Sequence, residues 1–132
     1  NEAVSPLEFK NRLSDACGLA RTHNYYGLVE QAGSIYVECE QGHLHAPIFS
    51  DIITRRHIDF SPADFGESGI MEVLSALPGS YPGHALLTED ESIILGEDDC
   101  SCGRLGKYFK VTGRLKNAEI RGCGDTYVSK FR

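Results

Sequence analysis

Three of the five cysteines lie in two short stretches of the sequence. Cys39 and His45 belong to "CEQGHLH", and Cys100 and Cys102 belong to "CSCGR", which a glycine can close into a turn. Three sulfurs and one imidazole can form a closed tetrahedral zinc site, with His43 as the alternative nitrogen ligand. We therefore predict that these residues bind one structural Zn²⁺. The competing interpretation is a set of reduced, buried cysteines without a metal.

Another cysteine, Cys123, stands between two glycines in "EIRGCGDTY", close to the end of the sequence. Flanking glycines bring no side chains to cover the thiol and give the backbone freedom, so we expect the thiol to be exposed. An exposed thiol is either a spare surface cysteine in a reducing compartment or a reactive group. The residues alone leave both interpretations open.

The bulk composition indicates one acidic domain. The chain has 132 residues, 41% of them hydrophobic, and a net charge of −6, which argues against a nucleic-acid partner. No apolar run approaches the roughly 18 residues of a membrane span, and the first residues lack the layout of a signal peptide. An odd number of cysteines argues against a disulfide framework. We therefore expect a cytoplasmic protein.

One helix is predicted near the start, in "SPLEFKNRLSDACGLA". Ser5 is the expected N-cap, Pro6 takes the first helical position and Glu8 follows three residues after the cap. Leu7 and nearby apolar residues form a partial stripe, and Gly18 ends the helix. This helix must be placed against the strands that follow.

The rest of the chain is rich in β-branched and aromatic residues and is interrupted by glycine and proline, which is typical of short strands. The expected strands are "SIYVEC", "PIFSDIITRR", "GIMEVLSAL", "HALLTEDESIIL", "GKYFKVTG" and "AEIRG". Glycines at 66, 69, 79, 83, 96, 103, 106 and 113 are expected in the turns between them. The predicted class is α+β: an N-terminal helix followed by a mostly antiparallel, distorted β-barrel-like subdomain.

The stretch "NYYGLVEQ" resembles the aromatic-Gly-x-Thr-Glu motif of adenylate-forming enzymes. The resemblance implies that Tyr26 lies against the adenine of ATP, that Gly27 leaves room for the base, and that Glu30 helps to hold Mg²⁺, for which a carboxylate is a suitable ligand. Val29 stands where the family usually has threonine. A buried strand end followed by a turn would produce the same short pattern.

Two further stretches follow in the order of that superfamily. "LLTED" resembles its Thr-Gly-Asp motif, which implies that Asp90 accepts hydrogen bonds from the ribose hydroxyls, with Glu89 in place of glycine. "VTGRLKNAEIRG" resembles its Gly-Arg motif, which implies that Arg114 contacts ribose or phosphate and that Lys116 lies at the hinge between domains. The alternative for Arg114 is a solvated charge at a strand end.

Nearly the whole chain resembles the acyl-protein synthetase of the bacterial bioluminescence fatty-acid reductase system, and related proteins of surface-polysaccharide gene clusters. This family adenylates a fatty or other carboxylic acid with ATP and moves the acyl group onto a cysteine near its C-terminus, from which a reductase takes it. By position that cysteine is Cys123, and its glycines would let it swing between two sites. Related aryl-CoA ligases, such as phenylacetate-CoA ligases, have a similar Cys/His and Cys-x-Cys layout.

The resemblance also implies the organisation of the chain. The phosphate-binding loop of the superfamily has no counterpart here, so we expect residues 1–132 to be a C-terminal fragment that does not catalyse adenylation alone. Residues 1–33 would hold the helix, a strand and the nucleotide-binding turn, residues 34–112 the β subdomain with the zinc site, and residues 113–132 the hinge-like segment and cysteine arm. The fold would match the C-terminal part of the superfamily's large domain.

Two other functions remain open, and two histidines are set aside. The chain could be a zinc-stabilised β module with a structural or interaction role, or a relative of the aryl-CoA ligases that passes its acyl group to coenzyme A. His23 and His57 have no partner at a useful spacing, so we expect surface or strand-end histidines and not general bases.

Overall fold

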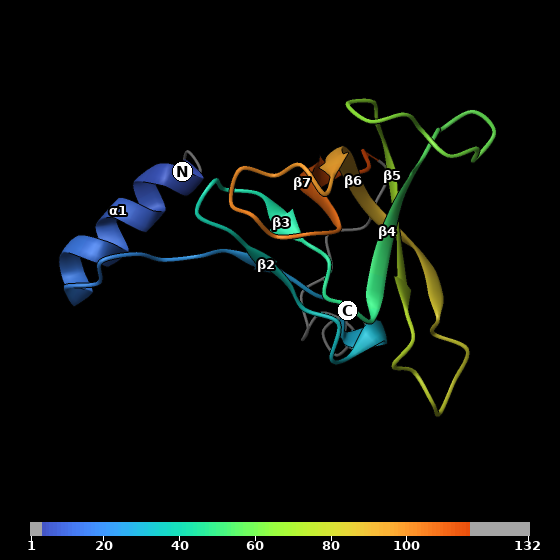
Figure 1. The fold of residues 1–132 in the computed structure, drawn as a ribbon, viewed down its shortest axis with the longest axis horizontal. Helices are drawn as coiled ribbons and strands as arrows, with labels where there is room; N and C mark the ends of the chain where they lie inside the picture. Colours follow the sequence, from blue (N-terminus) through green and yellow to red (C-terminus); the bar gives the residue numbers. More distant parts are fainter. Residues whose placement is uncertain (1–3, 117–132) are drawn as a thin grey trace, which may run out of the picture.

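Seven strands form one antiparallel sheet in the computed structural model of this protein, which describes residues 4–116 (Figure 1). The strand order is β1-β2-β3-β7-β6-β5-β4. The elements are α1 (Pro6–Cys17), β1 (Tyr25–Tyr26), the 3-10 helix η1 (Val29–Gln31), β2 (Tyr36–Glu38), β3 (Leu44–His45), β4 (Ser50–Arg55), β5 (Ser68–Ser75), β6 (Ala85–Glu97) and β7 (Lys107–Arg114).

The sheet is curled, so that strands near its two ends approach each other. β2 and β4 are far apart in the strand order, yet the Tyr36 hydroxyl on β2 donates to the backbone carbonyl of Asp51 on β4 at 3.2 Å. From β7, the Lys107 ammonium reaches the Asp51 carboxylate at 2.7 Å. These contacts require a half-barrel, because a flat sheet would hold these strands apart. The predicted curled, mostly antiparallel sheet after an N-terminal helix is thus confirmed in outline.

The core fills the concave side of this half-barrel with side chains from five strands. Tyr36 and Phe109 meet edge to face, with their ring centroids 5.5 Å apart and an angle of 81° between the rings. Burial raises the pKa of Tyr36 to about 12, so its hydroxyl remains a donor. The buried cluster comprises Tyr36, Ile52, Met71, Val73, Ile94 and Phe109.

The helix α1 begins and ends as predicted but buries no residue. The Ser5 hydroxyl accepts the backbone N–H of Glu8 at 3.2 Å, and Gly18 takes a left-handed conformation with φ of 65°. Within residues 4–116 the apolar stripe of this helix is largely uncovered, and the Leu7 side chain is 69% exposed. An ion pair between Lys10 and the buried Glu38 of β2 ties the helix to the sheet. None of the helices in residues 4–116 has the length and apolar character of a membrane span.

Several glycines expected in turns lie inside strands instead. Gly69 is in β5, where an added Cβ would sit 2.3 Å from the carbonyl oxygen of Arg55. Gly96 is in β6, where a Cβ would sit 2.5 Å from an oxygen of Asp99, and Gly113 is in β7. The prediction was wrong at these positions. At Gly69 and Gly96 glycine permits a close approach between neighbouring segments, which the local sequence does not reveal, whereas a Cβ added at Gly113 would meet nothing within 4 Å.

Candidate functional site

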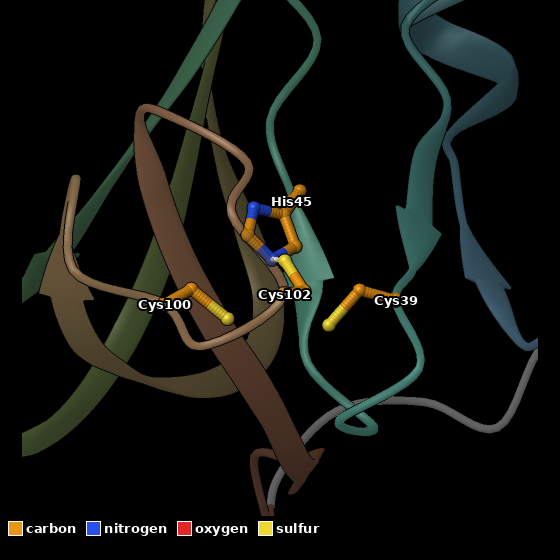
Figure 2. A group of neighbouring side chains, drawn as sticks. All are labelled: Cys39, His45, Cys100 and Cys102. Carbon is orange, nitrogen blue, oxygen red and sulfur yellow. Dashed lines mark hydrogen bonds between the residues drawn. The ribbon is translucent and has the colours of Figure 1, made fainter.

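Cys39, His45, Cys100 and Cys102 come together as one cluster. Their ligand atoms all lie within 4.8 Å of one another, and Figure 2 shows the four side chains pointing toward a common centre. Cys102 Sγ is 3.4 Å from Nε2 of His45. Cys39, His45 and Cys100 are buried and Cys102 is half-buried, so the cluster is largely shielded from solvent.

Two tight turns and one short strand position these ligands. Cys39 directly follows β2. Its carbonyl accepts the backbone N–H of Gly42 at 3.0 Å, and its backbone N–H donates to the carbonyl of His43 at 2.8 Å. Strand β3 then brings His45 between β2 and β7. In the turn after β6, the carbonyl of Cys100 accepts the N–H of Gly103 at 2.9 Å, which folds "CSCG" back toward His45. Sheet pairing therefore joins two distant segments at the cluster.

The local electrostatics favour binding of a cation. Burial alone would raise the pKa of the Cys39 thiol, but the N–H groups of His43 and Gln41 and the neighbouring thiols outweigh burial and hold this pKa below its ordinary value. Burial and the neighbouring sulfurs raise the pKa of Cys100. Burial lowers the pKa of His45, which keeps the imidazole neutral. A thiol whose pKa is lowered, beside a neutral imidazole, gives up its proton to a metal ion more readily than an ordinary buried thiol.

Tyr108 on β7 orients the histidines of this cluster. Its ring stacks on His45 with centroids 5.8 Å apart and an angle of 22°, and on His43 with centroids 5.1 Å apart. Nδ1 of His45 is buried without a hydrogen-bond partner in residues 4–116, so aromatic packing holds this ring where a metal-binding histidine usually donates a hydrogen bond from its other nitrogen. The alternative ligand His43 also lies close, with Nδ1 3.5 Å from Cys100 Sγ.

The donor set fits a soft or borderline metal ion. A tetrahedral site with Zn–S bonds of about 2.3 Å has ligand atoms about 3.8 Å apart, so the observed atoms need to move by less than about 1 Å. The cluster could therefore hold one metal ion through Cys39, His45, Cys100 and Cys102. Four protein ligands leave no open position for a reacting molecule, so the arrangement suits structural stabilisation.

A second group of side chains meets at the middle of β6, opposite the end of β7. The Tyr26 hydroxyl donates to Oδ2 of Asp90 at 2.7 Å, and Nε of Arg114 lies 3.4 Å from Oδ1 of the same carboxylate. Arg114 also pairs with Glu89 at 3.0 Å. Three of the residues in the predicted nucleotide motifs thus converge from β1, β6 and β7.

Thr88 holds the backbone of this second group. Its hydroxyl donates to the carbonyl of Met71 on β5 at 2.8 Å and accepts the N–H of Asp90 at 3.1 Å. Register places Asp90 directly opposite Arg114 across β6 and β7. The carboxylate therefore projects from a fixed position between two neighbouring strands.

The remaining nucleotide-motif residues lie apart from this group or beyond the described chain. Glu30 is exposed on η1 and, within residues 4–116, makes no hydrogen bond to Tyr26 or Asp90. A Cβ added at Gly27 would approach the Ile35 side chain at 3.3 Å, so this position is close-packed against the following loop. Lys116 is exposed at the end of the described residues, and Cys123 lies outside them.

Both histidines that were set aside have partners in the structure. Nδ1 of His23 lies 3.0 Å from the carbonyl oxygen of Glu38, and Nε2 of His57 lies 3.1 Å from the Glu91 carboxylate. The expectation that neither has a partner was wrong, because each contact joins a residue outside the strands to a strand that is distant in the sequence. Both residues are exposed, as expected of surface histidines.

The sequence reasoning missed the residues that support the two groups. Tyr108 and Glu38 belong to none of the recognised motifs, and Thr88 belongs to "LLTED" but was given no role there. The roles of all three depend on strand pairing. The alternation of buried and exposed residues along β2 could have indicated a buried Glu38, since an acidic residue on the inner face requires partners. No comparable signal marks Tyr108.

Comparison with known proteins identifies the family. No curated protein sequence matches the chain. A family model described as "Acyl-protein synthetase, LuxE" matches residues 1–132, the whole of the sequence. The chain therefore belongs to the LuxE acyl-protein synthetase family.

Proposed function

We propose that this chain is the C-terminal part of an ATP-dependent acyl-protein synthetase. The full-length enzyme would join a fatty or other carboxylic acid to AMP, releasing pyrophosphate, and then transfer the acyl group to a cysteine. Family membership supports ligase chemistry, and the meeting of Tyr26, Asp90 and Arg114 from three strands is the observation that carries the nucleotide assignment.

In this proposal Asp90 accepts hydrogen bonds from the ribose hydroxyls, and Arg114 contributes positive charge on the ribose or phosphate side. Tyr26, next to Gly27, lies beside the adenine, and Glu30 binds Mg²⁺. Glu30 is exposed and unpaired in residues 4–116, so its carboxylate is accessible to a cation.

The acyl acceptor in this proposal is Cys123. Its thiolate would attack the carbonyl carbon of the acyl-adenylate, form a thioester and expel AMP, after which a reductase protein accepts the acyl group. Lys116 would lie at the hinge of this movement. Residues 113–132 would thus form the hinge-like segment and cysteine arm, residues 34–112 the metal-bearing β subdomain, and residues 1–33 the helix, a strand and the nucleotide turn, as in the large domain of adenylate-forming enzymes.

The metal in this proposal is a structural Zn²⁺ on Cys39, His45, Cys100 and Cys102. It would join β2 and β3 to the turn between β6 and β7, and so hold together the strands that carry the nucleotide residues. The ion supplies stability and no chemical step.

The test follows the acyl group in the full-length enzyme. Incubation with labelled acid, ATP and Mg²⁺ is expected to label the protein in a hydroxylamine-sensitive form, because hydroxylamine cleaves thioesters. Cys123→Ser should abolish the label, whereas Cys17→Ser, which changes an exposed thiol on α1, should leave it intact. Label that resists hydroxylamine, or that persists in Cys123→Ser, would contradict the proposal. Activity of Cys123→Ser with coenzyme A would instead support the aryl-CoA ligase alternative.

The second candidate is a zinc-stabilised β module, which the buried Cys/His cluster favours for the isolated chain. In that case residues 1–132 would bind zinc without binding ATP, and Asp90→Asn in the full-length protein would leave ATP-dependent labelling unchanged.

A further inference from the structure

The Tyr26 hydroxyl makes a contact that a ring stacked on a base does not require. Tyr26 lies on the short strand β1 and donates to Oδ2 of Asp90 on β6 at 2.7 Å. The two residues are far apart in the sequence, and β1 and β6 are not neighbours in the sheet. The curl of the half-barrel brings them together, so the contact is a product of the tertiary fold.

The Asp90 carboxylate is held on both oxygens. Tyr26 occupies one side of Oδ2, and Nε of Arg114 lies 3.4 Å from Oδ1. An ionised carboxylate has about four acceptor sites, so about two remain for a ligand. The side chain is 17% exposed, which leaves part of it open to a ligand. Two acceptor sites on one fixed carboxylate match the two adjacent hydroxyls of a ribose.

Tyr26 itself is well fixed. Its ring packs against Tyr36 of the core with centroids 6.1 Å apart and a tilt of 57°. Burial, followed by the bond to Asp90, raises the pKa of Tyr26 far above its ordinary value, so the hydroxyl stays protonated. A rigid, permanently protonated donor restricts the rotation of the carboxylate that it binds.

We propose that Tyr26 is a positioning residue whose hydroxyl orients the Asp90 carboxylate to accept the ribose hydroxyls of ATP. This inference rests on the proposed nucleotide site and adds a role for the hydroxyl to that of the ring. Without the hydroxyl, Asp90 would turn toward Arg114, and its free acceptor sites would no longer face both ribose hydroxyls. The two roles are separable, because phenylalanine keeps the ring and removes only the donor.

The test uses the full-length enzyme with ATP and with 2′-deoxy-ATP as alternative substrates. Tyr26→Phe is expected to raise KM for ATP roughly tenfold with little change in kcat, since a hydrogen bond to a charged group is lost. The preference for ATP over 2′-deoxy-ATP, measured as a ratio of kcat/KM, should fall at least threefold. Tyr25→Phe is the matched control, because Tyr25 precedes Tyr26 on β1 and is 73% exposed. It should leave both quantities unchanged.

The ratio of kcat/KM for ATP to kcat/KM for 2′-deoxy-ATP does not change when part of the protein is unfolded, because inactive protein lowers both rates alike. A double-mutant cycle with Asp90→Asn adds a second criterion. If Tyr26 acts through Asp90, the two changes should be strongly non-additive in KM. Additive effects, or an unchanged substrate preference in Tyr26→Phe, would overturn the inference.

Failure of the nucleotide site itself is distinguishable from failure of this inference. If Asp90→Asn leaves KM for ATP unchanged, the assignment of Asp90 is wrong and the inference falls with it. If Asp90→Asn raises KM while Tyr26→Phe behaves as the wild type, the nucleotide site stands and only the positioning role is refuted.

Discussion

Removal of the metal is expected to destabilise the half-barrel by several kcal/mol. The perturbation is either chelation of the wild-type protein or Cys39→Ser, which deletes a ligand that is 2% exposed. The matched control is Cys17→Ser, which changes an exposed thiol at the end of α1. Both substitutions replace sulfur by oxygen, but only Cys39→Ser removes a member of the Cys/His cluster.

The magnitude follows from the length of chain that the metal closes. Cys39 and Cys100 are about sixty residues apart, so an ion bound by both acts as a cross-link on a long loop. Chain-entropy arithmetic for a cross-link of that length gives about 4 kcal/mol at 25 °C. For a domain of this size, 1 kcal/mol shifts Tm by roughly 3–6 °C, so loss of the metal should lower Tm by at least about 10 °C. Cys17→Ser should change the free energy of unfolding by less than about 0.5 kcal/mol.

The assay combines elemental analysis with thermal unfolding followed by circular dichroism. Protein purified without chelator should contain one equivalent of zinc, and Cys39→Ser should contain much less. Chelation should lower Tm of the wild type and of Cys17→Ser by the same amount, and should have little further effect on Cys39→Ser. This comparison separates the loss of the metal from the loss of sulfur packing, because the packing change is present in Cys39→Ser under both conditions.

Three results would refute this reasoning. Well under one equivalent of zinc in the wild type would show that the cluster is a set of reduced thiols. A chelated wild type with unchanged Tm would show that the ion, although bound, does not stabilise the fold. Equal zinc content in Cys39→Ser and the wild type would show that the ligands lie elsewhere.

Further predictions concern packing, pH and thiol reactivity. Gly69→Ala should destabilise the protein by about 3 kcal/mol in denaturant unfolding, because its Cβ would meet a backbone carbonyl oxygen at 2.3 Å; Gly79→Ala, with nothing within 4 Å, should be nearly neutral. Burial would raise the pKa of Glu38, but its bonds to a backbone N–H and an ammonium hold this pKa below 4.5. The ionised carboxylate therefore stabilises the fold above pH 4.5, and this stabilisation is lost as the pH falls through the lower pKa of the folded protein. The difference in unfolding free energy between the wild type and Glu38→Gln should accordingly shrink in acid. Alkylation followed by mass spectrometry should modify Cys17 quickly and Cys39 only after chelation, and rapid modification of Cys39 in untreated protein would contradict its burial.

The sequence by itself determined the features that depend on neighbouring residues or on ligand chemistry. The ends of α1 follow from Ser5 and Gly18, because capping involves only residues within one turn of the helix. The four members of the Cys/His cluster could be named in advance, because few combinations of soft ligands occur in a chain with five cysteines. The β-branched and aromatic residues, interrupted by glycine and proline, indicated short strands and a mostly antiparallel class of fold before any pairing was known.

Only the tertiary structure decided what depends on which strands lie side by side. The two-residue strands β1 and β3 carry too little pattern to be recognised alone, yet they place Tyr26 and His45. The bond from Tyr26 to Asp90, the stacking of Tyr108 on His45 and the close approach at Gly69 each join segments that are distant in the sequence. Local propensity carries no information about such contacts, because their geometry is set by strand order and by the curl of the sheet.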